Sequence, residues 1–527
     1  MQNPSTPSPL GLDRCDVHLP HVWASHARFT PHKPAIIFRD QIVSWSQFNA
    51  RMNKVANALL RDGHSSGSKV AVVMTNSVEM LEIMFGIVKA GNCVVPLSGM
   101  LTTEQLETLV RDSGATAIVT DEKLRHLVEP LLNRLPDIQQ GMSLAVGFEG
   151  DGWRSYAAFL ADSSPEEPAV RYSLDDAFNI TYSSGTTGLP KGIVQAHRAR
   201  LHWSWSNGIT FGFSRDSVAL ITTSLYSNGT WFMVLPPMLT GGTMVVMEQF
   251  TPASCIMLIE RYQASHAFLV PTQFNALLAE PTLHGACLSS LRMLLSAGSP
   301  LRMTTRKEAE QRICPHIFEL YGFSEGFATV ITPEDAARKP GSVGMPVIGF
   351  DLRIIDDAGV EVGPDMPGEI AGYGGGLMTG YHNRPDLTAD LIWHDALGRS
   401  FLRSGDIGQV DAEGFLTILD RKKDMILSGG FNVFPADIEQ VVAAHPDVAD
   451  VTVIGIPDEK WGETPLALVI LTAEARQDAI SIVEWANARL AKTQRLSRVE
   501  FRTDFPRNAL GKVLKRELRA PYWIQVQ

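Results

Sequence analysis

The sequence predicts an α/β fold: a large N-terminal domain of helix-covered β-sheets, followed by a small α+β C-terminal domain. Two observations support this prediction. Strand-like and helix-like segments alternate through the first part of the chain, and the character of the sequence changes near Asp420. The 527 residues are 45% hydrophobic and 20% charged. A chain of this length and composition can bury a large core and suggests roughly two to four folding units.

The alternation is clearest between residues 68 and 121. The β-rich run "SKVAVVMTN" leads into a predicted helix over 77–91, for which Asn76 and Glu79 have the spacing of an N-cap and its return partner. "CVVPLS" then predicts a strand. A second helix over 101–115 has Thr102 and Gln105 in capping-box spacing, and the strand "TAIVTD" follows it. Such alternation predicts a parallel sheet with helices on both faces.

Near Asp420 the sequence becomes charged and then glycine-rich in "LDRKKDMILSGGFNVFPADIE", and a helix is predicted to begin at Pro435. Two strand-like runs, "VADVTVIGI" and "PLALVILTA", and the helical "DAISIVEWANARLAK" follow. We therefore predict one domain over residues 1–420 and a second over 421–527.

The net charge and the spacing of the cysteines argue against several classes of binding site and of protein. Lys and Arg total 46 against 57 Asp and Glu, and the net charge of −11 opposes general binding to nucleic acid or anionic lipid. The five cysteines form no CxxC pair, which argues against a zinc site or a disulfide framework. No signal peptide and no apolar run of about 18 residues is found, so we expect no membrane span and a cytoplasmic protein.

The stretch "TYSSGTTGLPKGIVQAHRAR", which begins at Thr181, is a candidate phosphate-binding loop. It does not fit the GxxxxGK[ST] pattern of nucleotide triphosphatases. Even so, glycines allow backbone N–H groups to converge on an anion, while hydroxyls and one lysine add donors and charge, which suits a pyrophosphate group. Taken alone, the stretch fits a flexible surface turn equally well. The candidate residues are Ser183, Ser184, Gly185, Thr186, Thr187, Gly188 and Lys191.

Five further motifs follow this stretch in order: "SAGSP" (296–300), "LYGFSEG" (320–326), "RSGDIG" (403–408), "DRKKDMILSGGFNVFPADIE" (420–439) and "PRNALGKVLKREL" (506–518). Together the six motifs resemble those of the acyl-adenylate-forming (AMP-binding) superfamily, and most of all the acyl-CoA synthetases. The resemblance covers about residues 20–520. It implies that the C-terminal domain is mobile, with Lys423 at its hinge, and that the loop around Lys191 closes over the phosphates of ATP.

The resemblance also assigns nucleotide-binding roles. Tyr321 would stack on the adenine, Asp406 would accept hydrogen bonds from the ribose hydroxyls, and Arg421 would reach the ribose or a phosphate. The other residues carried over to the nucleotide and CoA sites are Ser296, Ala297, Gly298, Gly322, Ser324, Gly429 and Gly430. In isolation, "YGFSEG" is instead typical of a helix N-cap at Ser324.

Three residues are carried over as catalytic: Lys512, Glu325 and Lys191. Lys512 would bridge the substrate carboxylate and the α-phosphate, and Glu325 would hold Mg²⁺. Without the resemblance, Lys512 belongs to a basic tail of the kind that is usually only hydrated. The implied reaction activates a carboxylic acid with ATP to an acyl-adenylate and then transfers the acyl group to CoA, releasing AMP and pyrophosphate.

The acid itself is less defined by the sequence. Ser227 stands where many acyl-CoA synthetases have a gate histidine, and residues 217–247 contain no Asp or Glu that would pair with an amino-acid ammonium group. A fatty or aryl acid is therefore the predicted substrate, with Trp231, Phe232, Phe268 and Phe274 as candidate pocket walls or core residues. The alternatives are a stand-alone adenylation protein that loads a carrier protein, a luciferase-like oxygenase, and a pseudoenzyme that only binds ligands.

Overall fold

The computed structural model describes residues 16–183, 191–428, 431–507 and 512–523. These residues form two compact units. Unit 1 comprises residues 16–183, 191–267 and 378–383, and unit 2 comprises the described residues of 268–377 and 384–527.

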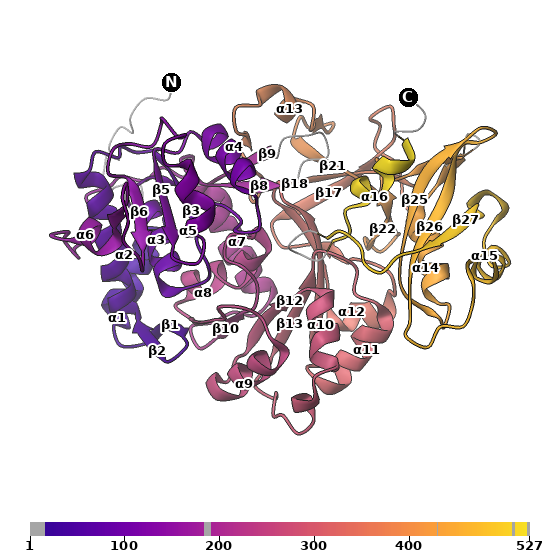
Figure 1. Ribbon diagram of the computed structural model, residues 1–527, viewed down its shortest axis with the longest axis horizontal. Helices are drawn as coiled ribbons and strands as arrows, with labels where there is room; N and C mark the ends of the chain where they lie inside the picture. Colours follow the sequence, from indigo (N-terminus) through magenta and orange to yellow (C-terminus); the bar gives the residue numbers. More distant parts are fainter. Residues whose placement is uncertain (1–15, 184–190, 429–430, 508–511, 524–527) are drawn as a thin grey trace. The chain divides into compact units, whose positions relative to one another are not determined.

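Unit 1 begins with helix α1 and is an alternation of helices and strands (Figure 1). Its elements are α1 (Leu19–Phe29), β1 (Pro34–Phe38), β2 (Gln41–Ser44), α2 (Trp45–Arg61), β3 (Lys69–Val73), α3 (Val78–Lys89), β4 (Cys93–Pro96), α4 (Thr103–Ser113), β5 (Ala117–Asp121), α5 (Arg125–Val128), η1 (Glu129–Leu131), β6 (Ser143–Val146), β7 (Arg154–Ser155), α6 (Tyr156–Leu160), β8 (Ala177–Ser183), β9 (Lys191–Ala196), α7 (His197–Thr210), β10 (Val218–Ile221), η2 (Asn228–Phe232), α8 (Leu235–Thr240), β11 (Thr243–Val246), α9 (Pro252–Tyr262), the first half of β12 (His266–Leu269) and β19 (Gly380–Tyr381).

The predicted parallel sheet is present in unit 1. Its strands lie in the order β19-β9-β8-β4-β3-β5-β6-β7, and the pairs from β8 through β4, β3, β5 and β6 to β7 are all parallel. Helices α4 and α5 pack on one face through a core that includes Leu106, Leu109 and Val128. On the other face, α2 and α3 pack together so closely that a Cβ at Gly86 would lie 2.5 Å from the Cβ of Val55.

The helix signals of the sequence are partly confirmed. Thr102 and Gln105 form the predicted capping box at the start of α4. The prediction for α3 is wrong by one residue, because Ser77 is its N-cap and accepts a hydrogen bond from the Met80 N–H (3.0 Å). Asn76 instead donates to the carbonyls of Thr223 and Met247, so long-range contacts occupy the side chain that local spacing assigned to the cap.

A second sheet lies in unit 1, with β10 between β11 and β12, and with β1 joining β11 to the antiparallel strand β2. Apart from the β1–β2 pair, these pairs are parallel. The described part of the chain has no helix whose length and hydropathy would let it cross a membrane.

Unit 2 contains the remaining elements. These are α10 (Pro271–Leu278), η3 (Pro281–Leu283), β13 (Met293–Ala297), α11 (Met303–Arg312), β14 (Ile317–Phe323), β15 (Phe327–Ile331), α12 (Pro333–Arg338), β16 (Met345–Pro346), β17 (Phe350–Ile355), β18 (Gly368–Gly374), α13 (Pro385–Ala389), β20 (Ile392–His394), β21 (Ser400–Val410), β22 (Leu416–Arg421), β23 (Ile426–Ser428), β24 (Phe431–Val433), α14 (Pro435–Ala443), β25 (Val448–Asp458), β26 (Gly462–Leu471), α15 (Ala479–Asn487), η4 (Lys492–Gln494), β27 (Arg498–Phe501) and α16 (Lys515–Trp523).

Unit 2 has three groups of strands. Parallel strands β13 and β14 continue into the antiparallel strands β15 and β16. Strands β17, β18, β21, β20 and β22 form an antiparallel sheet. The last sheet has the order β24-β23-β26-β25, with β27 parallel to β26.

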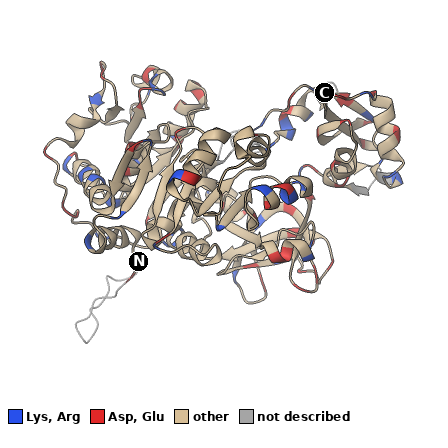
Figure 2. Ribbon diagram, turned by 90° about the horizontal axis from the view of Figure 1, so that it is seen from below, with Lys and Arg blue, Asp and Glu red and all other residues tan. Residues whose placement is uncertain are grey.

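The predicted C-terminal elements are confirmed, and their core is built around Val453, Ala467 and Ile482 from β25, β26 and α15. Helix α14 begins at Pro435, as predicted. In Figure 2 both acidic and basic residues occur along the ribbon.

Candidate active site

Three of the predicted nucleotide-binding side chains meet in unit 2. The Tyr321 hydroxyl on β14 donates to the Asp406 Oδ2 atom (2.7 Å), and the Arg421 Nε atom lies 3.2 Å from Asp406 Oδ1. Asp406 and Arg421 are direct partners in the β21–β22 ladder. The Asp406 side chain is only 8% exposed. Burial beside this carboxylate raises the pKa of Tyr321 well above its ordinary value, so the phenol remains a donor.

The turn that carries Asp406 is held by Glu369, a residue that the sequence analysis did not identify. The Glu369 carboxylate accepts hydrogen bonds from Arg403 Nη2 (2.6 Å) and from the Gly405 N–H (3.2 Å). The Asp406 N–H in turn donates to the Ser404 Oγ atom (3.0 Å). Glu369 is a positioning residue, since it holds the Arg403 side chain and the Gly405 N–H immediately before Asp406.

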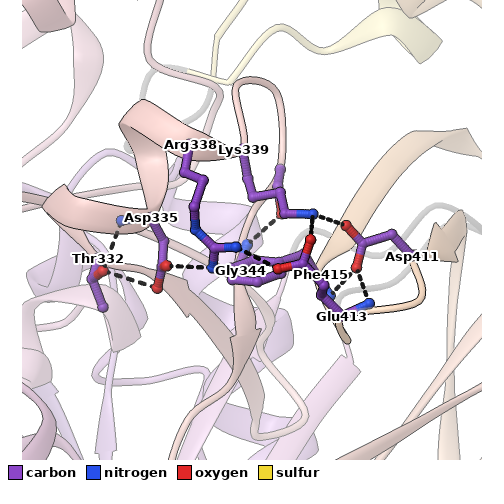
Figure 3. A network of polar contacts seen from close by, with 9 residues as sticks. Thr332, Asp335, Arg338, Lys339, Gly344, Asp411, Glu413 and Phe415 are labelled. Carbon is purple, nitrogen blue, oxygen red and sulfur yellow. Dashed lines mark hydrogen bonds and ion pairs between the residues drawn. The ribbon is translucent and has the colours of Figure 1, made fainter.

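The far end of the β21–β22 hairpin is anchored to helix α12 by the polar network in Figure 3. Lys339 Nζ lies 2.7 Å from Asp411 Oδ2 and 2.6 Å from Glu413 Oε1, and Arg338 pairs with Glu413 as well. Asp411 also accepts from the Phe415 N–H (2.9 Å), which closes the turn. The strands that carry Asp406 and Arg421 are thereby fixed at both ends.

Lys512 belongs to the same cluster. The charges of Asp406 and Asp424 favour its ammonium form, and the charges of Arg421 and Lys423 oppose it. Burial is the largest effect, and it lowers the pKa of Lys512 to about 8. A desolvated cation of this kind, close to the Asp406 carboxylate, can stabilise a developing negative charge and differs from a hydrated basic tail.

The "SAGSP" motif lies beside Tyr321 because β13 pairs with β14. Ser296 is in register with Glu319, and Ala297 with Leu320. The Ser296 hydroxyl is fully buried and has no hydrogen-bond partner within the described residues, which leaves it available to a ligand. Gly298, with a φ of +93°, ends the strand in the left-handed region that favours glycine.

The "YGFSEG" motif forms a turn, so the interpretation of Ser324 as a helix N-cap is wrong. Strand β14 ends at Phe323, which pairs with Phe327 of β15, and the Gly326 N–H donates to the Phe323 carbonyl (3.0 Å). Glu325 and Ser324 therefore stand at the tip of a hairpin. A Cβ at Gly322 would lie 2.4 Å from the Phe327 carbonyl oxygen, so this position requires glycine.

Glu325 fits a magnesium site of the kind that uses few protein ligands. The described residues include no group of three or more His, Cys, Asp or Glu side chains that could hold a metal. Mg²⁺ in nucleotide sites is commonly held by one or two carboxylates together with substrate phosphates and water. A single carboxylate at a hairpin tip matches that donor set.

The two described ends of the candidate phosphate loop, Ser183 and Lys191, belong to unit 1. Ser183 and Lys191 pair across the β8–β9 hairpin, and the Lys191 Nζ atom lies 4.8 Å from the centre of the Tyr381 ring. The sequence analysis did not identify Tyr381, because "TGYHNRP" has no distinctive composition. Ser184, Gly185, Thr186, Thr187 and Gly188, like Gly429 and Gly430, lie outside the described residues.

The candidate acyl segment also lies in unit 1. Ser227 precedes helix η2, in which Trp231 is 2% exposed and donates from Nε1 to the Leu225 carbonyl (2.9 Å). The Trp231 and Phe178 rings are 6.1 Å apart. Trp231 thus serves as a packed core residue.

Comparison with known proteins identifies the family. The model of the AMP-binding enzyme family matches residues 23–382, and that of the AMP-binding enzyme C-terminal domain matches residues 437–512. This chain belongs to the AMP-binding enzymes.

Full-length relatives and solved structures agree with this assignment. The feruloyl-CoA synthase of an Amycolatopsis species is 32% identical over 94% of this chain and 96% of its own length. The indoleacetate–CoA ligase of Aromatoleum aromaticum is 33% identical over the same shares of the two chains. The o-succinylbenzoate CoA synthetase of Bacillus subtilis, solved with ATP and a magnesium ion, has a TM-score of 0.82 at 26% identity and covers 94% of this chain and 98% of its own.

These findings confirm the predicted family, the α/β fold class and the class of enzyme, an AMP-forming acid–thiol ligase that uses ATP, Mg²⁺ and CoA. They favour CoA over a carrier protein as the thiol acceptor. The roles of individual residues, the boundary at residue 420 and the cytoplasmic location remain predictions.

Proposed function

We propose that this enzyme activates a fatty or aryl carboxylic acid as its acyl-adenylate at the cluster of Asp406, Tyr321, Arg421 and Lys512, and then transfers the acyl group to CoA. The observation that carries the proposal is this cluster: a buried carboxylate bonded to a tyrosine and an arginine, with a desolvated lysine beside it. Four motifs, spread from residue 320 to residue 518, supply these groups.

In the first step, the carboxylate of the acid attacks the α-phosphorus of ATP, and pyrophosphate leaves. Asp406 accepts hydrogen bonds from the ribose hydroxyls, and Arg421 adds positive charge beside it. Lys512 brings its ammonium group to both the incoming carboxylate and the α-phosphate, where negative charge develops. When bound, Mg²⁺ neutralises phosphate charge, and Glu325 is the residue that would hold it.

The role of Glu325 predicts a magnesium-dependent defect. Glu325→Gln keeps the shape of the side chain but removes its charge, so we expect the rate of pyrophosphate release to fall by about 10²-fold at low Mg²⁺. Raising the Mg²⁺ concentration should recover part of that loss. The measurement is a Mg²⁺ titration of acid-dependent pyrophosphate release.

The matched control is Glu334→Gln, which alters an exposed glutamate of the first turn of α12. This variant should follow the wild-type titration. A Glu325→Gln enzyme with unchanged magnesium dependence would remove Glu325 from the metal site.

In the second step, the thiolate of CoA attacks the acyl carbonyl, the acyl–phosphate bond breaks and AMP leaves. The domain over residues 421–527 is the part that moves between the two steps, and it carries Lys512 away from the adenylate. The family resemblance assigns Gly429 and Gly430, which lie outside the described residues, to the path of the pantetheine arm, where the absence of side chains would leave room for a thin ligand.

The test is a screen of pyrophosphate release over straight-chain, branched and aromatic carboxylic acids, each with CoA and with a phosphopantetheinylated carrier protein. We expect acid-dependent release of pyrophosphate and AMP, with thioester formed on CoA. Thioester formed on the carrier protein and not on CoA would favour the alternative acceptor. Failure of every acid to release pyrophosphate would contradict the proposal.

A further inference from the structure

Helix α7 carries an unusual set of polar side chains into the interior of unit 1. A helix that covers a core normally turns an apolar stripe inward. Here the buried residues of α7 include the polar side chains His197, Arg200, His202, Ser204, Ser206 and Asn207. The helix follows directly after β9, which begins at Lys191.

Arg200 is the charged member of this set. It is 1% exposed, and it donates from Nε to Asn179 Oδ1 and from Nη2 to Asn228 Oδ1, each at 2.8 Å. Its guanidinium carbon lies 4.6 Å from the centre of the Trp231 ring. Within the described part of the chain, Arg200 forms no ion pair with a carboxylate, and its hydrogen bonds come from Nε and Nη2.

Burying an arginine with only neutral partners destabilises the folded protein. Two amide oxygens and an aromatic face recover only a small part of the hydration free energy that the guanidinium loses. Desolvation alone lowers the pKa of Arg200 to about 9. Buried cations in proteins are ordinarily paired with an anion, and the planar guanidinium fork fits a carboxylate best. An anion supplied by a ligand would complete this arrangement.

Two buried amides near Arg200 also lack partners. Gln195 is the cross-strand partner of Asn179, and neither its Oε1 nor its Nε2 atom is hydrogen-bonded within the described residues. Asn207 lies two helical turns after Arg200 on the same face of α7, and both of its amide atoms are equally without partners. Buried polar groups of this kind are normally satisfied by protein, water or ligand.

We propose that Arg200 is the centre of a specificity subsite that binds a second anionic group, a carboxylate at the far end of the acid that the enzyme activates. The inference rests on the proposed function. Asn228, which holds the guanidinium, directly follows Ser227 in the segment that the family resemblance places beside the acyl group. The amides of Gln195 and Asn207 offer further donors and acceptors to the polar end of that acid.

The subsite narrows the substrate class to dicarboxylic acids with an apolar chain or ring between the two carboxyl groups. One carboxylate is adenylated, and the other neutralises Arg200. Residues 217–247 contain no acidic side chain, so no group of that segment competes for the guanidinium.

The test compares each dicarboxylic acid with its monomethyl ester, which keeps the shape and removes the second charge. We expect the wild-type enzyme to prefer a diacid of suitable length over its ester by about 10²-fold or more in kcat/KM, measured as pyrophosphate release. Arg200→Met should reduce this preference at least about 10-fold while leaving the KM for ATP unchanged. Arg200→Lys should retain part of the preference.

The matched control is Arg198→Met, since Arg198 is exposed on the same helix and pairs with Asp175. It should keep the wild-type preference. A second measurement, the shift in melting temperature on adding diacid without turnover, should show stabilisation of the wild-type protein and none of Arg200→Met, with ATP stabilising both.

The wild-type comparison decides the matter even if Arg200→Met does not fold. If the wild-type enzyme activates monomethyl esters and simple monocarboxylic acids as well as any diacid, the proposed subsite is wrong. The proposed function would remain intact in that case. Equal stabilisation by chloride or phosphate, without any preference among acids, would show an adventitious ion only and would also overturn it. No activation of any acid would count against the proposed function itself.

Discussion

Replacing Lys512 by alanine is expected to abolish acyl-adenylate formation while leaving transfer from a supplied acyl-adenylate to CoA largely intact. Lys512 is partly buried and interacts electrostatically with Asp406 and Arg421, the cluster at which we propose that the α-phosphate binds. Removal of such a preorganised charge typically lowers a rate by about 10²–10³-fold. The two half-reactions are measured separately, as ATP–pyrophosphate exchange and as thioester yield from added acyl-adenylate.

The control for this substitution is Lys492→Ala, which removes an exposed lysine from the same basic part of the chain. It should leave both half-reactions unchanged. Equal losses in the two half-reactions of Lys512→Ala would contradict a role confined to adenylation and would indicate damage to the fold.

The same lysine sets an expected pH dependence. Burial lowers the pKa of Lys512 to about 8, so its ammonium form is lost as the pH rises through that value, well below the range of an exposed lysine. The kcat/KM for ATP reports groups of the free enzyme, and it should therefore fall above about pH 8. Lys512→Arg should lack this alkaline decline, because a guanidinium does not deprotonate there.

Local patterns in the sequence predicted the fold class because the signals of unit 1 are short-range. The capping box of Thr102 and Gln105 lies within one helical turn, so the sequence contains all of it. The N-cap of α3 was assigned to Asn76 and not to Ser77, because the bonds that engage Asn76 come from residues about 150 positions away. Spacing alone carries no information about such partners.

The candidate site shows the same difference between features that lie within a short motif and features that depend on distant residues. Tyr321, Asp406, Arg421 and Lys512 lie in recognisable motifs, and the structure brings them together. Glu369 and Tyr381 were missed, since each acts through a neighbour that is distant in the sequence: the turn at Gly405 for Glu369, and the ammonium of Lys191 for Tyr381. Arg200 was missed because its burial and its lack of an anionic partner are properties of the packed chain.

Asp406→Ala is expected to raise the KM for ATP by roughly 10²–10⁴-fold, since a hydrogen bond to a charged group contributes about 1.5–3 kcal/mol and a ribose offers two hydroxyls to this carboxylate. The variant also leaves the hydroxyl of Tyr321 and the guanidinium of Arg421 without their shared acceptor. The measurement is the ATP dependence of pyrophosphate exchange at a saturating concentration of the acid.

Graded substitutions separate the carboxylate from the architecture around it. Asp406→Asn keeps the shape and one acceptor oxygen, so its KM for ATP should lie between those of the wild type and Asp406→Ala. Tyr321→Phe removes a single hydrogen bond to Asp406 and should have a smaller effect than Asp406→Asn. Asp386→Ala, at an exposed position of α13, should behave as wild type. Asp406→Ala removes the whole carboxylate that is proposed to bind the ribose. A normal KM for ATP in this variant would therefore mean that the ribose is bound elsewhere.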